Sequence, residues 1–133
     1  MDNIDKLVEE LLKQFVNGCE DVELVPYGWS SPFSFKKNLN IAATINRKCY
    51  PVAGAIIYYS YNKPVCAIIN TSNRKYLLWW EFKESSTTYR GLYEFLNYHG
   101  IAKGKLNRRV IEDIKKSYKS FFVNQLKENK EKN

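Results

Sequence analysis

The fold is decided by residues 54–82, GAIIYYSYNKPVCAIINTSNRKYLLWWEF. This stretch contains three runs rich in β-branched and aromatic residues, which are typical of strands. The runs are 54–61, 65–69 and 75–82. Short polar turns at 62–64 and 71–74 separate them. Because parallel neighbours need a crossover of about a dozen residues, turns this short predict an antiparallel meander.

The last of these strands is apolar on both of its faces. Tyr76, Leu78 and Trp80 alternate along the pleat with Leu77 and Trp79. A strand of this kind has to be covered on both sides. We therefore expect a helix on each face of the sheet.

Amphipathic segments before and after the strands predict helices. Over residues 3–17, apolar side chains recur with the spacing of one helix face, and Gly18 follows as a typical end signal. Serines and threonines open a second helix over 87–98, which Gly100 ends. A third helix is predicted over 107–126. Its apolar face is expected to contain Val110, Ile111, Ile114, Tyr118, Phe121 and Phe122.

The segments between the first helix and the meander predict two more strands and a loop. Residues 22–25 and 41–46 are the strand candidates, and the stretch 26–40, which holds two prolines and three serines, predicts a loop. Four aromatic residues in this loop are expected either to pack on the core or to form an exposed contact surface. They are Tyr27, Trp29, Phe33 and Phe35.

Together these segments predict an α+β fold. An N-terminal helix precedes an antiparallel meander sheet of three to five strands, and a middle helix and a C-terminal helix pack on that sheet. The 133 residues have the length of one domain. We expect this domain to span 1–126, followed by a polar, frayed tail at 127–133.

Charge is distributed unevenly along the chain, whose formal net charge is +7. Residues 1–23 carry a net −5, whereas 24–102 and 103–133 each carry +6. A basic excess attracts phosphate backbones, anionic lipid or an acidic protein surface. The same excess also fits a solvated surface that binds nothing.

Several classes of function find no support in the sequence. No run approaches the roughly 18 apolar residues of a membrane span, and the acidic N-terminus is unlike a secretory signal. Cys19, Cys49 and Cys66 form no CxxC pair and His99 is the one histidine, so neither a zinc site nor any other metal site is expected. Free thiols favour a reducing cytoplasm. Because the common nucleotide-binding and hydrolase motifs are absent, we expect no cofactor and no enzymatic activity.

Basic residues near strand and helix ends are the candidates for contacts to phosphate. They are Lys83, Arg90, Arg108, Arg109, Lys115, Lys116 and Lys119. Trp79 or Trp29 is the expected surface on which a base would stack.

Two local patterns mark the start of the second helix. Ser85, Thr87 and Thr88 are expected to cap it, and the same hydroxyls form a candidate anion site. Glu81 and Lys83 form an E-x-K tripeptide like that of many metal-dependent nucleases. Such nucleases need a second carboxylate from a preceding strand, and residues 24–80 contain no Asp or Glu. At the other end of this helix, His99 is expected to act as a cap and not as a catalyst.

Residues 60–96 contain Ser60-Tyr61, 64–67 (PVCA) and, after an aromatic strand, a second group of residues. This second group is Ser85, Thr87, Thr88, Arg90, Phe95 and Leu96. With these residues the segment resembles a small domain found in proteins of phages and mobile plasmids. The domain has no assigned function, and the resemblance implies a phage or mobile-element protein that works in the host cytoplasm.

The chain departs from the pattern of that family at two positions. Cys66 stands where Ala is usual, and Gly91 stands where the family has His. A glycine inside a helix costs about 1 kcal/mol relative to alanine. We therefore expect close packing, or the close approach of a ligand, at Gly91.

These observations lead to three hypotheses. The first is a small non-enzymatic accessory protein that binds DNA or RNA through a basic surface, without contact to membranes. The second is a phage-encoded inhibitor of a host defence protein, of the anti-CRISPR or anti-restriction type, which binds through the aromatic residues of the loop. The third is a divergent metal-dependent nuclease that uses Glu81 and Lys83. The partner and the oligomeric state stay open.

Overall fold

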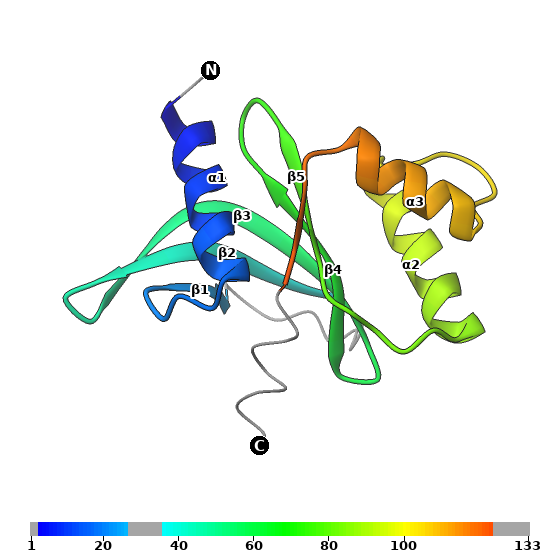
Figure 1. Ribbon diagram of the computed structural model, residues 1–133, viewed down its shortest axis with the longest axis horizontal. Helices are drawn as coiled ribbons and strands as arrows, with labels where there is room; N and C mark the ends of the chain where they lie inside the picture. The colour runs from blue at the N-terminus through cyan, green and yellow to red at the C-terminus, as the bar shows by residue number, and fades with distance from the viewer. Residues whose placement is uncertain (1–2, 27–35, 124–133) are drawn as a thin grey trace.

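The computed structural model describes residues 3–26 and 36–123 and contains three helices and six strands in these ranges (Figure 1). In chain order the elements are α1 (Asn3–Val16), β1 (Val22–Pro26), β2 (Lys36–Ile45), β3 (Lys48–Ser60), β4 (Lys63–Asn70), β5 (Lys75–Trp79), α2 (Ser86–Tyr98), α3 (Arg108–Ser117) and β6 (Ser120–Phe122). None of these helices is long and apolar enough to cross a membrane.

The six strands form one sheet in the order β1-β2-β3-β4-β5-β6. Strands β1 to β5 pair antiparallel with their sequence neighbours, as the short turns predicted. The added strand β6 runs parallel to β5. The predicted α+β fold is therefore confirmed, with one strand more than expected.

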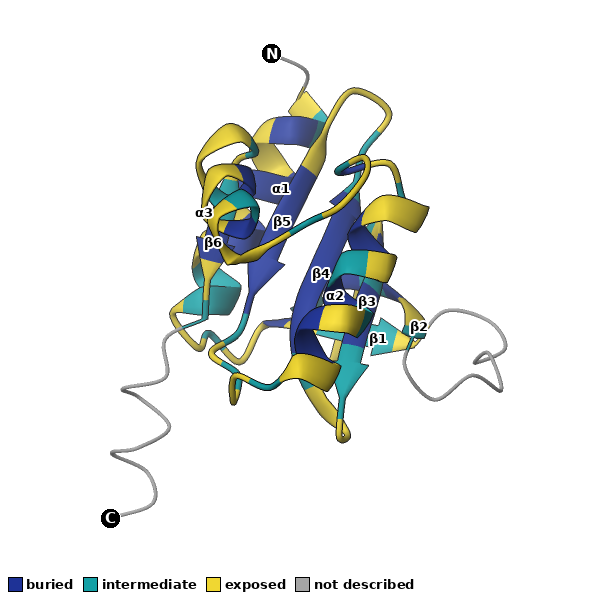
Figure 2. Ribbon diagram, turned by 90° about the vertical axis from the view of Figure 1, so that its right-hand side faces the viewer, coloured by how far each residue is buried: buried dark blue, intermediate teal, exposed yellow. Residues whose placement is uncertain are grey.

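Helices cover both faces of the sheet (Figure 2). Tyr76 and Leu78 of β5 pack into a core with α1, whereas Leu77 and Trp79 pack into a second core with α2 and α3. All four side chains are at most 2% exposed. The alternating apolar pattern of β5 thus builds a three-layer molecule, with α1 on one face and α2 with α3 on the other.

The predicted third helix over 107–126 is wrong in its second half. The helix ends at Ser117, and Tyr118 is already extended at φ −98° and ψ 148°. Phe121 is 8% exposed and the next residue, Phe122, is 54% exposed, which is the alternation of a strand. The edge of β5 explains the change, because its backbone pairs with this segment through bonds such as Val123 N–H to the Trp79 carbonyl at 2.9 Å.

The predicted loop over 26–40 is wrong at its C-terminal end. Residues 27–35, with Tyr27, Trp29, Phe33 and Phe35, lie outside the described residues. Residues 36–40 form the first half of β2 and pair with 54–58 of β3. Their polar side chains resemble a loop in the sequence, but Leu39 is buried among them in the core beneath α1.

Candidate functional site

Helix α2 packs closely against Tyr58 of β3 at residue 91, which has no side chain. A Cβ on Gly91 would overlap the hydroxyl of Tyr58 and lie 2.7 Å from its Cζ. The Tyr58 ring stacks on Phe95 with centroids 5.7 Å apart, and its hydroxyl donates to the Thr88 carbonyl at 3.1 Å. The close packing expected at Gly91 is confirmed, and it places the helix over the β3–β4 hairpin.

A cluster of hydroxyls connects the start of α2 to the end of β3. The Oγ of Ser85 accepts from the Thr88 N–H at 3.2 Å, which confirms that Ser85 caps the helix. Thr88 Oγ1 lies 3.0 Å from Ser85 Oγ and 2.8 Å from Ser60 Oγ. The hydroxyls of Ser85 and Thr88 therefore hydrogen-bond within the protein, while Thr87 is exposed at the surface. Anion binding by this group stays a prediction.

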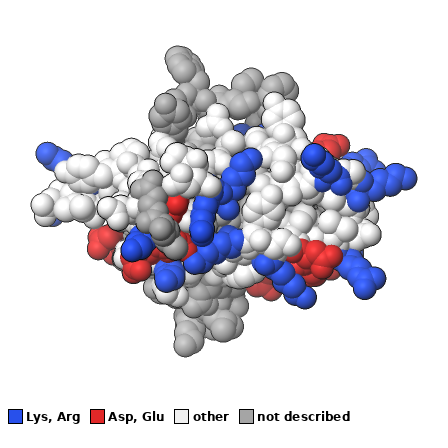
Figure 3. All heavy atoms as spheres, turned by 90° about the horizontal axis from the view of Figure 1, so that it is seen from above, with Lys and Arg blue, Asp and Glu red and all other residues white. Residues whose placement is uncertain are grey.

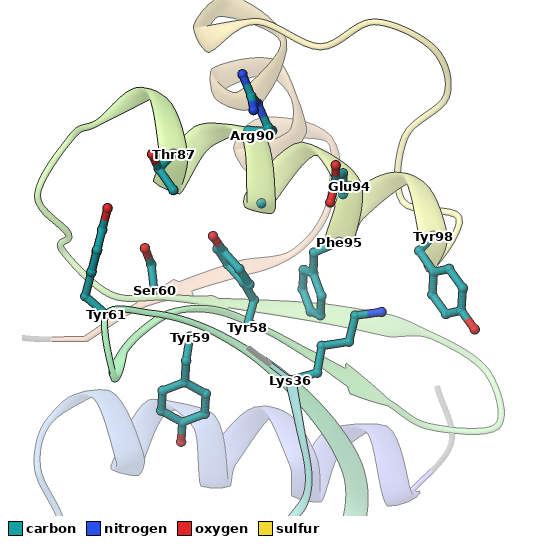
Figure 4. A pocket seen from close by; sticks show the side chains of 11 residues that line it. Lys36, Tyr58, Tyr59, Ser60, Tyr61, Thr87, Arg90, Glu94, Phe95 and Tyr98 are labelled. Carbon is teal, nitrogen blue, oxygen red and sulfur yellow. The ribbon is translucent and has the colours of Figure 1, made fainter. Parts of the chain in front are cut away.

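Between α2 and β3 lies a cavity of about 490 Å³, whose floor is aromatic (Figure 4). Tyr58 and Phe95 form this floor. Tyr61 and Tyr98 stand at its two ends and are 75% and 77% exposed. The side chain of Tyr59 points away, to the opposite face of the sheet. We refer to this cavity, together with the one described next, as the α2 cleft.

A second cavity of about 430 Å³ continues the first along the β3–β4 hairpin. Ser60 and Tyr61 line both cavities, so the two adjoin at the hairpin turn. Lys63, Glu81 and Lys83 line the second cavity. The α2 cleft thus runs from Tyr98 past Tyr61 toward the start of the helix.

The turn that carries Tyr61 has an unfavourable backbone. Tyr61 has φ 52° and Asn62 has φ 64°, the positive values of a two-residue hairpin turn that usually contains Asn-Gly. A bulky residue at positive φ is an outlier, because its Cβ crowds the backbone. Such outliers gather at functional sites. The strained turn places the Tyr61 ring in solvent at one end of the first cavity.

Four cationic side chains and two carboxylates line the α2 cleft. They are Lys36, Lys63, Lys83, Arg90, Glu81 and Glu94. The Nζ of Lys36 lies 3.9 Å from the centre of the Tyr98 ring, a cation–π contact at one end of the cleft. Burial raises the pKa of Tyr58, and the nearby Glu94 charge raises this pKa further, against the lowering effect of the Ser60 hydrogen bond.

The seven basic residues predicted from the sequence do not form one surface. Lys83 and Arg90 line the α2 cleft, and Arg108 joins Arg90 at a neighbouring hollow of about 360 Å³. Arg108 is also paired with Glu84 at 3.5 Å. The start of α2 thus brings three of the seven together.

The other four lie elsewhere. Lys115 is 3.2 Å from Glu112 and lies over the Trp79 ring, and Lys119 pairs with Glu9 of α1. Arg109 and Lys116 are exposed on α3. On the face seen in Figure 3, Asp and Glu side chains lie beside the Lys and Arg side chains.

The predicted stacking surfaces are also placed differently. Trp79 is 2% exposed, so no base can stack on it, and Trp29 lies outside the described residues. Sequence reasoning missed Tyr61 and Tyr98, which are the exposed rings at the ends of the α2 cleft. The sequence placed Tyr61 at the end of the strand 54–61, whereas in the structure it lies in the turn between β3 and β4, where an aromatic residue has no packing role.

The remaining predictions concern metal and proton chemistry. Glu81 and Lys83 both line the second cavity. Within residues 3–26 and 36–123, no group of three His, Cys, Asp or Glu side chains could hold a metal ion. His99 is the C-terminal cap of α2, as predicted. Burial, with Lys36 and Lys75 nearby, lowers the pKa of His99.

The residues that carry the resemblance to the phage and plasmid domain converge on the α2 cleft. Ser60, Tyr61, Ser85, Thr88 and Arg90 all line it. No curated protein and no solved structure matches the chain. A family model, described as a family of unknown function (DUF8033), matches residues 23–113, a range that includes every residue of the cleft. Since this match covers more than half of the chain, the protein belongs to that family of unknown function.

Proposed function

We propose that the protein is a non-enzymatic binder of single-stranded nucleic acid, and that the α2 cleft is its binding surface. The observation that supports this most is the pair of exposed rings, Tyr61 and Tyr98, at the two ends of an aromatic-floored cavity. Bases stack on exposed aromatic side chains at about 1–3 kcal/mol each. A duplex hides the faces of its bases, so this arrangement favours a single strand, of DNA or of RNA.

The charges of the cleft agree with this ligand. Lys36, Lys63, Lys83 and Arg90 line the cleft and can contact successive phosphates. If all four do so, the logarithm of the affinity falls with the logarithm of the salt concentration with a slope of about −3.

The test is fluorescence anisotropy with labelled single-stranded 12-mers at low and physiological salt. Tyr61→Ala and Tyr98→Ala are each expected to weaken binding about tenfold, because one stacked base is lost. Arg90→Gln is expected to weaken binding and to make the salt slope shallower.

Matched controls come from the tip of the β2–β3 hairpin. Tyr50 of β3 is 49% exposed, and Arg47 is exposed in the turn that precedes this strand. Tyr50→Ala and Arg47→Gln remove the same side-chain types outside the cleft, and neither should change the affinity. Equal losses at both places would contradict the cleft as the binding surface.

The same experiment separates the two other hypotheses. A divergent nuclease would shorten the labelled strand when Mg²⁺ is added, and Glu81→Gln would stop the cleavage. An inhibitor of a host defence protein would leave the oligonucleotide free at physiological salt. Either result would overturn the proposal of a non-enzymatic nucleic-acid binder.

A further inference from the structure

Glu94 is an unusual side chain for a cleft that binds a polyanion. Among the residues that the structure describes, it is the one carboxylate that lines the cavity between Tyr61 and Tyr98. Glu94 is exposed, and among the described residues it makes no hydrogen bond and no ion pair. Arg90 precedes it by four positions, a spacing at which opposite charges on a helix commonly pair. In Figure 4 the two side chains do not point toward each other.

The position of Glu94 directs its charge into the cavity. It follows Gly91 by three residues on α2, so both lie on the helix face that borders β3. Its charge acts on the hydroxyl of Tyr58, whose ring forms the floor. Because Glu94 lines the cavity between the two exposed rings, a base that stacks there would bring one of its edges to the Glu94 carboxylate.

An ionised carboxylate only accepts hydrogen bonds, and this property distinguishes the bases. Guanine presents two adjacent donors on its Watson–Crick edge, N1–H and the N2 amino group. Cytosine and adenine each place an amino donor beside a ring nitrogen that accepts. Thymine and uracil place one N–H between two carbonyl oxygens, which a carboxylate repels. Glu94 thus matches guanine best and thymine or uracil worst.

We propose that Glu94 makes the α2 cleft selective for guanine in a single strand, by accepting hydrogen bonds from guanine N1–H and N2–H. This inference rests on the proposed function, because it concerns a base already held in the cleft. The Glu94 carboxylate would then contribute to base specificity, although its negative charge is unusual in a cleft that binds a polyanion.

The experiment compares labelled dT 11-mers that carry one central dG, dA, dC or dT. The corresponding uridine 11-mers are measured in the same way. The strand with dG is expected to bind about tenfold more tightly than the all-dT strand, which is the usual effect of a bidentate hydrogen bond between a side chain and a base. Deoxyinosine lacks the N2 amino group and should lose most of this preference. A single guanine per strand prevents the assemblies that guanine-rich strands form.

Protein variants identify the residue responsible. Glu94→Gln removes the charge and keeps the shape, so the ratio of dG to dT affinity should fall to about two or less, on the scale of such contacts. Glu10→Gln on α1, an exposed position on the opposite face of the sheet, makes the same charge change and should leave the ratio unchanged. The ratio of the dG affinity to the dT affinity is the diagnostic quantity. The loss of electrostatic repulsion between Glu94 and the strand would raise both affinities together and leave their ratio unchanged.

The outcomes separate the two proposals. If no strand binds, the proposed function fails and the Glu94 inference fails with it. If all strands bind alike, or if Glu94→Gln raises every affinity equally, the cleft still binds nucleic acid and only the guanine selectivity is overturned. A dG preference that depends on both Glu94 and the N2 amino group supports the inference.

Discussion

The two faces of the sheet differ in what their polar side chains do. On the α1 face, Asp5 is 2% exposed and accepts from Thr71 Oγ1 at 2.6 Å and from Asn73 Nδ2 at 3.2 Å. Glu9 on the same helix is also buried and pairs with Lys119. These groups join α1 to the β4–β5 turn and to the segment before β6. They stabilise the fold, and the buried Tyr76 hydroxyl on this face has no hydrogen-bond partner among the described residues.

On the α2 face, two charged side chains at the cleft have no such partners. Arg90 and Glu94 make no hydrogen bond and no ion pair among the residues that the structure describes. Tyr61 and Tyr98 expose their rings to solvent. The contrast indicates that polarity near a core is not by itself a sign of function. A candidate site is marked by polar or aromatic side chains that the fold holds in place but that make no stabilising contact within the protein.

The largest effect on stability is expected for Asp5→Ala. The substitution removes a buried carboxylate and leaves Thr71 and Asn73 without this acceptor. Hydrogen bonds to charged groups contribute about 1.5–3 kcal/mol each, so the free energy of unfolding should fall by about 3 kcal/mol. Urea denaturation measures this change. Asp21→Ala, at an exposed position, is the control, and oligonucleotide binding should survive Asp5→Ala wherever the protein stays folded.

Gly91→Ala comes second and affects the α2 face. The new methyl group would overlap the Tyr58 hydroxyl, so the ring must move and lose its hydrogen bond to Thr88. Overpacking of this kind lowers the free energy of unfolding by about 1–3 kcal/mol, although alanine is the better helix former.

A double-mutant cycle, measured by urea denaturation, tests whether Tyr58 is the cause. Tyr58→Leu shortens the side chain that the new methyl group meets, so Gly91→Ala should cost less in that background. If Gly91→Ala costs the same with and without the Tyr58→Leu substitution, the close approach of α2 depends on something else.

Tyr61→Gly is expected to separate stability from binding. Glycine adopts the positive φ of this turn without strain, so the free energy of unfolding should rise by about 1 kcal/mol while the affinity for single strands falls. Arg47→Gly makes the same backbone change in the β2–β3 turn, where φ is 66°. It should raise stability equally and leave binding unchanged. A loss of stability in Tyr61→Gly would mean that the Tyr61 ring makes stabilising contacts and is not only exposed to solvent.

Sequence patterns predicted the layers of the fold better than the site, and the reason is physical. The alternation of Tyr76 to Trp79 requires two covered faces, and that requirement alone indicated helices on both sides. Phe121 and Phe122 fit a helical face and a strand equally over such a short stretch, and only the free edge of β5 decides between them.

The site depends on contacts between distant segments. Lys36 and Tyr98 are 62 positions apart in the chain and form one end of the cleft. Composition predicted that basic residues and aromatic residues would occur together. It could not show that Trp79 is buried whereas Tyr98 is exposed, because both follow an apolar pattern and only the packing of α2 distinguishes them.

The smallest expected effect concerns His99, which is an exception on the α2 face. Its Nε2 is buried and has no hydrogen-bond partner among the described residues, and the ring packs edge-on against Phe95 and beside Tyr98. Burial first, and then the charges of Lys36 and Lys75, lower its pKa below the ordinary value of 6.5. The unfolded chain therefore binds the proton more readily than the folded protein does.

The sign of the pH dependence follows from that difference. The contribution of neutral His99 to stability is fully present above pH 6.5, and it is lost as the pH falls from there through the folded-state pKa. Urea denaturation at a series of pH values, for the protein and for His99→Gln, isolates this term as the difference between the two curves. The variant should lose less stability on acidification. Parallel curves would mean that His99 is protonated as easily in the fold as in the unfolded chain, and that its unpartnered nitrogen reaches water.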